Sequence, residues 1–102
     1  MRSIWVKPFI LPLLESGRKP LEVRLATSFF LSIKVGEILC FNNSVQKRVV
    51  AVRRYSDFAS MLEKEDSRRI HPDWPQETIL NELKRIYGQR EQLGILVFEL
   101  GD

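Results

Sequence analysis

The stretch GRKPLEVRL, residues 17–25, contains the clearest strand pattern in the first part of the chain. The glycine suits the turn that ends a preceding helix, and Pro20 biases the residue before it toward an extended backbone. Apolar residues then occupy every second position of LEVRL, with Glu22 and Arg24 between them. Side chains alternate between the faces of a strand. The stretch therefore predicts a strand over 21–25 with one apolar face and two opposite charges on the other.

The charged face of this strand has two interpretations. On spacing alone we favour a solvated ion pair, which contributes at most about 1 kcal/mol to stability. If a helix covers that face, however, the charges must be paired, and they then form a polar pocket with shifted pKa values. The residues by themselves leave both interpretations open.

The rest of the chain predicts several strands with short helices between them. Continuous apolar composition at Val49–Val52 indicates burial on both faces, and Ser56 with Asp57 resembles a helix N-cap. The apolar segment Phe29–Ile33 has no clear period. We expect further strands at 3–7, 38–41, 47–55 and 94–100. We also expect three helices. The first begins at Pro8 and ends before Gly17, the second follows Asp57, and the third runs from about 76 to 87 and is ended by Gly88.

The connections between the expected strands are mostly too short for parallel crossovers. We therefore predict an α+β fold, a small mixed or antiparallel β-barrel with peripheral short helices. The length of 102 residues suits one domain over 1–102. With 44% hydrophobic and 28% charged residues, a folded core is expected.

Composition limits the partners and the compartment. The net charge of +3 tolerates a polyanion but does not require one. Cys40 is the single cysteine, which excludes an intramolecular disulfide, and its setting EILCF predicts a buried structural thiol. The longest uncharged run, Pro8–Leu14, is far shorter than the roughly 20 residues that span a bilayer. We read no signal peptide and expect a cytoplasmic protein without a membrane partner.

Several kinds of catalytic centre find no support in the sequence. His71 is the single histidine and lies in a proline-flanked loop, HPDWP, far from Cys40 in sequence. A zinc site or a Ser-His-Asp or Cys-His triad would have to use it. Neither a Walker loop nor G-x-G-x-x-G is present. The sequence therefore predicts no metal and no cofactor.

The remaining chemistry suits RNA. Arg24 offers a planar fork for a phosphate or a base edge, and Lys19 offers a compact positive charge. Glu22 can accept a hydrogen bond from an exocyclic amine. An unpaired base stacked on an aromatic ring gains about 1–3 kcal/mol, although aromatic residues of so small a domain are more often core; the candidates are Trp5, Tyr55, Trp74 and Tyr87. The scattered Lys and Arg pairs are typical of solvated surface.

At this point the residues carry a resemblance to a known family. Gly17, Lys19, Glu22 and Arg24 form G-x-K-x-x-E-x-R, which resembles the signature of the ASCH domain family. Three further blocks are similar to that family in the same order, namely IKVGEILCF at 33–41, VVAVRRYSDFASMLEKE at 49–65 and IYGQREQLGILVFEL at 86–100. The resemblance spans nearly the whole chain. It implies a PUA-like β-barrel with an RNA-facing cleft between barrel and helices.

The resemblance also implies where ligand would bind. It places Lys19, Glu22 and Arg24 on the floor of the cleft and assigns wall positions to Lys7, Tyr87 and Arg90. The expected partner is single-stranded RNA or a modified nucleoside.

One branch of the family removes the acetyl group of N4-acetylcytidine with a lysine, a threonine and a glutamate. Lys19 matches the lysine, but Glu22 stands at the threonine position, and the third role has only Glu63 and Glu65 as nearby candidates. If the protein is an enzyme, Lys19 would be base or activator and Glu22 its proton partner, in amide hydrolysis or RNA cleavage. A non-catalytic module that binds an acidic protein is the third hypothesis. The oligomeric state and the role of the acidic residues of helix 57–66 stay open.

Overall fold

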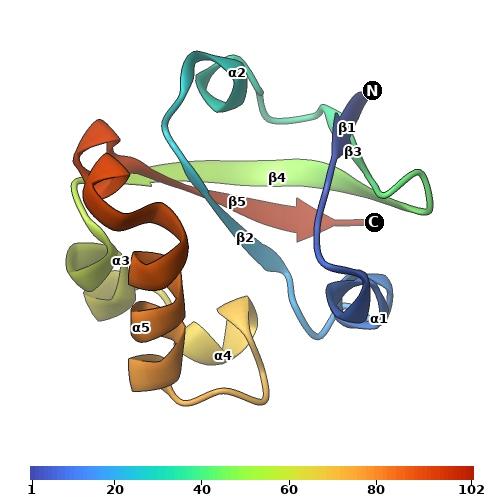
Figure 1. The fold of residues 1–102 in the computed structure, drawn as a ribbon. Coiled ribbons are helices and arrows are strands. Elements are labelled where there is room, and N and C mark those ends of the chain that lie inside the picture. Colours follow the sequence, from blue (N-terminus) through green and yellow to red (C-terminus); the bar gives the residue numbers. More distant parts are fainter.

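The computed structural model describes all residues 1–102 and contains one curled five-stranded sheet (Figure 1). Along the sheet the strands follow the order β1-β3-β4-β5-β2. β1 runs parallel to β3, and the other neighbours are antiparallel. The mixed sheet and the accompanying helices confirm the predicted α+β class. The strands are β1 (Arg2–Ile4), β2 (Leu21–Leu25), β3 (Ile38–Phe41), β4 (Val45–Tyr55) and β5 (Ile95–Gly101).

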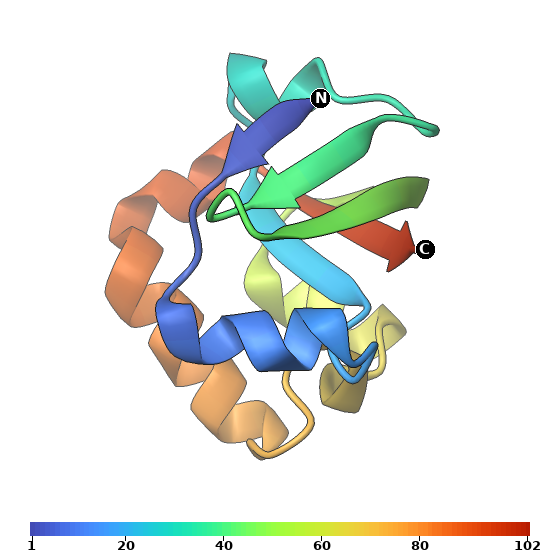
Figure 2. The same ribbon diagram turned by 90° about the vertical axis from the view of Figure 1, so that its right-hand side faces the viewer.

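Short helices surround the sheet. Figure 1 shows α3, α4 and α5 gathered at one side of the molecule, beside β2 and β5. Figure 2 shows the blue helical segment of the N-terminal part crossing below the curled strands, with orange α5 beside it. The helices are η1 (Pro8–Ile10), α1 (Leu11–Glu15), α2 (Ser28–Leu31), α3 (Phe58–Lys64), α4 (Ser67–Ile70), α5 (Gln76–Tyr87) and η2 (Gly88–Leu93), where η marks a 3-10 turn.

The sheet separates two hydrophobic clusters. The first includes Phe41, Val49 and Phe98, and the second joins all the apolar residues of β2 to residues of α3, α4 and α5. Leu21, the first residue of β2, is completely buried. Complete burial of such a side chain contributes about 1.5–3 kcal/mol. The apolar face predicted from LEVRL is thus confirmed, and the second cluster fixes the helices against β2.

β4 differs from its sequence-based prediction in two ways. It begins at Val45, two positions before the expected start, because the hairpin after β3 is tight and pairs Phe41 with Val45. The prediction that Val49–Val52 is buried on both faces is wrong at Val50, which is 46% exposed. The pairing of β4 with β5 shifts between Val49 and Ala51, so the extra residue bulges out of the ladder. Cys40 is half-buried rather than buried, because the side chains of its neighbours on β3 take the core side.

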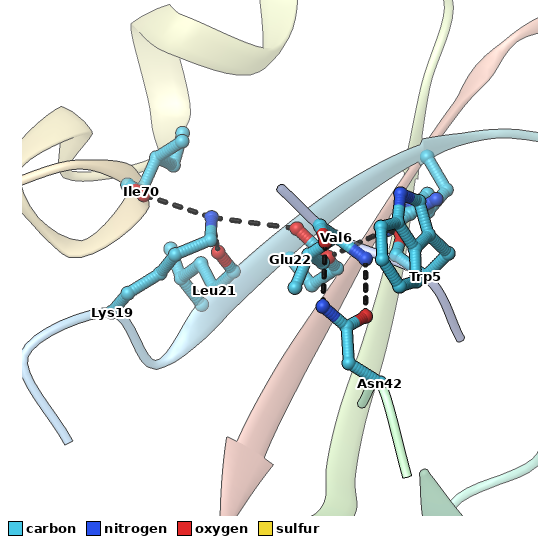
Figure 3. A network of polar contacts seen from close by, with 8 residues as sticks. Trp5, Val6, Lys19, Leu21, Glu22, Asn42 and Ile70 are labelled. Carbon is cyan, nitrogen blue, oxygen red and sulfur yellow. Dashed lines mark hydrogen bonds and ion pairs between the residues drawn. The ribbon is translucent and has the colours of Figure 1, made fainter. Parts of the chain in front are cut away.

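The N-terminal strand is shorter than predicted. β1 ends at Ile4. The backbone groups of Val6, beyond this end, make hydrogen bonds with a side chain instead of a neighbouring strand. The Asn42 Oδ1 accepts from the Val6 N–H at 2.8 Å, and the Asn42 Nδ2 donates to the Val6 carbonyl at 2.7 Å. This reciprocal pair holds the chain against the β3–β4 turn after β1 has ended (Figure 3).

The helices follow their local signals. Asp57 caps α3 by accepting from the Ser60 N–H at 2.7 Å, as the sequence predicts. α5 has the predicted bounds, and Gly88 ends it with φ +54°. The N-terminal helix is divided into η1 and α1, and the apolar segment near Phe29 forms α2. The closing strand, β5, starts and ends one residue later than expected.

Candidate functional site

A cavity of about 310 Å³ opens between β2, the segment that follows β1, and α5. Its size is at the lower end of the usual range for small-molecule sites, about 300–1,000 Å³. Eleven of its seventeen lining residues are hydrophobic, so polar side chains are few and concentrated. The other six are Lys7, Lys19, Glu22, Arg24, His71 and Glu82, and Tyr87, counted among the hydrophobic residues, adds a hydroxyl.

Lys19 lies at the buried end of the cavity, and its ammonium group is fully bonded (Figure 3). Nζ donates to the Leu21 carbonyl at 2.8 Å and to the Ile70 carbonyl at 2.9 Å. It also lies 3.4 Å from the Glu22 Oε1. An ammonium has three donors, so these contacts occupy all of them. Lys19 thereby ties the end of α4 to the free edge of β2.

Glu22 stands between two cations. Its Oε1 faces Lys19, and its Oε2 accepts from the Arg24 Nη2 at 2.9 Å. The Glu22 side chain is 8% exposed, whereas that of Arg24 is 19% exposed. The face that carries these charges is therefore covered, and the interpretation as a solvated ion pair is wrong. The sequence could not decide this, because the covering residues come from distant parts of the chain.

The charges shift each other's titration. Burial by itself would raise the pKa of Glu22, but attraction to Lys19 and Arg24 outweighs burial and holds this pKa below its usual range. Burial lowers the pKa of Lys19, against the opposing attraction of Glu22, and nearby Arg24 lowers it further. The carboxylate thus stays ionised at neutral pH, while the ammonium is easier to deprotonate than in water.

Arg24 is held on two sides and open on the others. Nη2 donates to the Trp5 carbonyl at 2.8 Å as well as to Glu22, which links the free edge of β2 to the chain beyond β1. Its guanidinium carbon lies 5.4 Å from the centre of the Phe30 ring. Nε and Nη1 make no hydrogen bond within the protein. Because no buried side-chain nitrogen or oxygen lacks a partner, these two nitrogens are not buried. These donors are therefore accessible to solvent or ligand.

Tyr87 forms part of the wall contributed by α5. Its ring packs 5.8 Å from that of Phe58 on the core side, and burial raises the pKa of its hydroxyl. The hydroxyl has no partner in the protein and is not a buried unpaired atom, so it is accessible. Arg90 is exposed and does not line the cavity; its guanidinium lies 5.8 Å from the centre of the Tyr87 ring.

The loop after α4 supplies a second aromatic wall. The His71 and Trp74 rings stack in parallel, with 4.0 Å between centroids and an interplanar angle of 6°. His71 is 8% exposed, and burial followed by the nearby positive charge of Lys19 lowers its pKa. Sequence reasoning treated His71 only as an improbable member of a triad and did not place it at the site. The loop has no hydrophobic period, so the only available signal was its dense aromatic and proline content.

The mouth of the cavity exposes large apolar side chains. Trp5 is 69% exposed, Phe9 is 55% exposed and Ile86 is 44% exposed. Lys7 lies in sequence between the two aromatic residues and is also exposed. Glu82 on α5 lines the cavity with both oxygens engaged by Arg85, one of them with Nε at 3.0 Å. The mouth therefore combines aromatic surface with one free cation.

Five of the six residues predicted to contact ligand line the same cavity, namely Lys7, Lys19, Glu22, Arg24 and Tyr87. Arg90 lies outside it. Of the aromatic candidates, Trp5 and Trp74 line the cavity, and Tyr55 does not. The cavity walls that sequence reasoning missed are His71, Glu82, and the apolar residues Val6, Phe9, Ile10, Val23, Ile70, Ile79, Leu83 and Ile86.

The acidic residues near α3 have structural partners away from the cavity. Glu65 accepts from Arg53 at 2.6 and 2.9 Å and from the Tyr55 hydroxyl at 2.5 Å. The bond from Arg53 is the main reason why the pKa of Glu65 is lowered. Glu63 is exposed. Neither carboxylate lines the cavity, so neither occupies the third catalytic position considered from the sequence.

Two further properties of the structure bear on partners. No group of three or more His, Cys, Asp or Glu side chains is placed so that it could hold a metal ion. None of the helices combines the length and the apolar character needed to cross a bilayer.

The architecture is that of a curled half-barrel in which the end strand β2 borders a cavity of the size of a small-molecule site. The model of the ASCH domain family matches residues 6–98, and the chain belongs to that family. No curated protein sequence matches it.

Solved structures share the fold over nearly all of the chain. The crystal structure of hypothetical protein PH0355 has a TM-score of 0.90 and 28% identity, with 98% of this chain and 97% of that one covered. The solution structure of protein PF0455 from Pyrococcus furiosus has a TM-score of 0.82 and 27% identity, with 97% and 94% covered. The crystal structure of ASCH from Zymomonas mobilis has a TM-score of 0.68 and 13% identity, with 98% and 66% covered. The predicted family and PUA-like fold are confirmed.

Proposed function

We propose that this protein binds single-stranded RNA or a nucleoside by taking one unpaired base into the cavity. The observation that carries the proposal is Arg24, which is clamped by Glu22 and the Trp5 carbonyl while its Nε and Nη1 remain without partners. A guanidinium positioned in this way presents a rigid fork, the geometry that suits a base edge or a phosphate. Membership of the ASCH domain family supports the same class of ligand.

The walls suit the faces of a base. Trp74, Tyr87 and the aliphatic residues of α5 provide apolar surface, and stacking tolerates any base because every base has a π-face. Lys7 at the mouth is free to meet a phosphate. In this proposal Lys19 and Glu22 mainly orient Arg24, and Arg90 supports Tyr87 from outside.

The test is binding of a fluorescein-labelled short oligouridylate, followed by anisotropy. Arg24→Lys retains the charge but not the fork, so the dissociation constant should rise roughly tenfold or more, the effect of losing one or two hydrogen bonds to a charged group. Arg54→Lys is the matched control, since Arg54 is an exposed residue of β4 outside the cavity and has no side-chain hydrogen bond. Equal affinity of the two variants would refute the assignment of the cavity, provided that both have the thermal midpoint of the wild type.

A second candidate function is hydrolysis of N4-acetylcytidine. The observation that favours it is a buried lysine with a lowered pKa beside a carboxylate inside a cavity. The amide C–N bond would break, water would add its hydroxyl to the acyl carbon, and N4 would take the proton, giving acetate and cytidine. To act as a base, Lys19 must first release one of its two carbonyl contacts.

Cytidine formation followed by chromatography tests this candidate. Conversion by the wild type that is abolished in Lys19→Met and retained in Lys64→Met, an exposed lysine of α3, would support hydrolysis. Absence of conversion by the wild type would refute it and would leave the binding proposal untouched. Turnover that is indifferent to Lys19→Met would exclude Lys19 as the base.

A further inference from the structure

His71 has one ring nitrogen that is committed to the backbone. Its Nδ1 accepts a hydrogen bond from the Asp73 N–H at 3.2 Å. A neutral imidazole has one donor and one acceptor. Since Nδ1 is the acceptor, the ring proton of neutral His71 resides on Nε2. Burial lowers the pKa of His71, which favours this neutral form at physiological pH.

The Nε2–H of His71 is available to a ligand. It has no hydrogen-bond partner in the protein, and no buried side-chain nitrogen or oxygen lacks a partner. Nε2 is therefore accessible, although the residue as a whole is only 8% exposed and lines the cavity. The stack on Trp74 and the Asp73 contact together restrict the ring. His71 thus supplies a restrained donor at the wall of the cavity.

The polar groups of the cavity that have no partner in the protein are mainly hydrogen-bond donors. Both carboxylates that line it are already occupied, Glu22 by Lys19 and Arg24, and Glu82 by Arg85. The groups without partners are the Arg24 Nε and Nη1, the His71 Nε2–H, the Lys7 ammonium, the indole N–H groups of Trp5 and Trp74, and the Tyr87 hydroxyl, of which all but the hydroxyl can only donate. A ligand pairs these donors only if it presents hydrogen-bond acceptors to them.

We propose that His71 is a specificity-determining residue that donates its Nε2–H to a carbonyl oxygen of the bound base. The cavity then favours bases that carry oxo groups, such as uracil, over adenine, because each oxo oxygen offers two lone pairs to these donors and each ring nitrogen of adenine offers one. This inference rests on the proposed function, because it names the class of base for the same cavity. Stacking alone does not require histidine at this position, since phenylalanine would stack on Trp74 equally well.

The first experiment reads the tautomer without any ligand. His71 is the only histidine of the chain, so a long-range ¹H–¹⁵N spectrum contains the signals of one imidazole, and they belong to His71. At neutral pH we expect the Nε2–H form, and addition of oligouridylate should shift the Nε2 resonance more than that of Nδ1. A spectrum of the Nδ1–H form, or an Nε2 that does not respond to a bound oligomer, would overturn the proposal.

The second experiment tests whether His71 contacts one of the carbonyl oxygens of uridine. Wild type and His71→Phe are titrated with oligouridylate that contains uridine, 2-thiouridine or 4-thiouridine at its central position, because sulfur accepts a hydrogen bond poorly. In the wild type, one of the two sulfur substitutions should weaken binding roughly tenfold, the effect of one lost hydrogen bond. In His71→Phe, binding of the uridine oligomer should be weaker by a similar factor, and the same sulfur substitution should have no further effect.

The outcomes separate the two proposals. If wild type binds no oligomer, the proposed function fails and this inference fails with it. If wild type binds and His71→Phe responds to sulfur as the wild type does, only the role of His71 is refuted. Should His71→Phe unfold, which its thermal midpoint reports, the Nε2 response of the wild type decides the question alone.

Discussion

Glu22 shows how burial and charge compete at a single residue. Its side chain is 8% exposed, an environment in which an unpaired carboxylate is very costly. Lys19 and Arg24 each contact a different oxygen of this carboxylate, so neither oxygen is left without a partner. A buried network of this kind stabilises the fold only while all its members are present, because the removal of one leaves its partners buried and unpaired.

Glu22→Gln should therefore destabilise the protein. Two buried or half-buried cations would then face a neutral amide, and we expect the free energy of unfolding to fall by about 3 kcal/mol. Urea denaturation at neutral pH measures the change. Glu63→Gln, at an exposed position of α3, is the control and should alter stability by less than about 0.5 kcal/mol. A loss equal to that of the control would contradict the role assigned to the network.

His71 should make stability depend on pH. Its pKa is lower in the folded protein than its ordinary value of 6.5, because of burial and of the cations Lys19 and Arg18, against the opposing effect of Asp73. The unfolded chain then binds a proton that the folded protein does not bind. Stability is therefore fully present above the unfolded pKa and is lost as pH falls through it toward the folded pKa.

Chemical denaturation at about pH 7.5, 6.5 and 5.5 tests this dependence in a range where carboxylates of ordinary pKa stay ionised. Wild type should lose stability over this interval, and His71→Phe should show a flatter profile. Since the chain has one histidine, no other imidazole contributes to the difference. Parallel profiles for the two proteins would show that His71 does not carry the effect.

At the scale of elements, the junction between β1 and the β3–β4 turn positions the mouth of the cavity. Asn42 bonds both backbone groups of Val6, which brings Trp5 and Lys7 to the cavity beyond the end of β1. The turn has two consecutive residues with positive φ, Asn42 at +52° and Asn43 at +55°. Asparagine tolerates this left-handed conformation better than most residues.

This turn provides a matched pair of variants. Asn42→Ala and Asn43→Ala impose the same left-handed strain, but only the first leaves the Val6 N–H and carbonyl without partners. Asn42→Ala should therefore be less stable than Asn43→Ala by about 1–3 kcal/mol. Differential scanning calorimetry measures the difference, and equal thermal midpoints would mean that water replaces the side chain at no cost.

At the scale of the whole molecule, positive charge is spread rather than concentrated. The net charge is +3, and many cations are already paired with carboxylates, among them Arg2, Arg53 and Lys47. Of the three lysine and arginine side chains that line the cavity, Lys19 and Arg24 share the carboxylate of Glu22, which leaves Lys7 as the unpaired cation. Binding of a single strand should therefore depend on few phosphates.

The salt dependence of oligouridylate binding tests this distribution. Each phosphate neutralised on a single strand contributes about −0.7 to the slope of log K against log salt, so contact with one or two phosphates gives a slope of about −0.7 to −1.4. Lys7→Ala should reduce its magnitude by about 0.7, while Lys34→Ala, an exposed residue outside the cavity, should not. A slope steeper than about −3 would instead indicate an extended basic track.

The sequence predicted those features that depend on neighbouring residues. The alternation of LEVRL gave β2 its correct bounds, the apolar stripe and glycine gave those of α5, and Asp57 was correctly identified as a cap. Predictions failed where a distant partner decides the outcome. The bulge at Val50 depends on the register against β5, and the early end of β1 depends on the side chain of Asn42.

By itself, therefore, the sequence determined the family, the α+β class and the amphipathic character of β2, since each depends on residue order within a segment or on blocks along the chain. Only the tertiary structure decided that the charges of β2 are covered and not solvated, and that His71, Trp74 and α5 complete a cavity around them. The physical reason is that burial belongs to the assembled chain. Lys19 becomes a buried ammonium only when the Ile70 carbonyl, 51 positions away, closes over it at 2.9 Å.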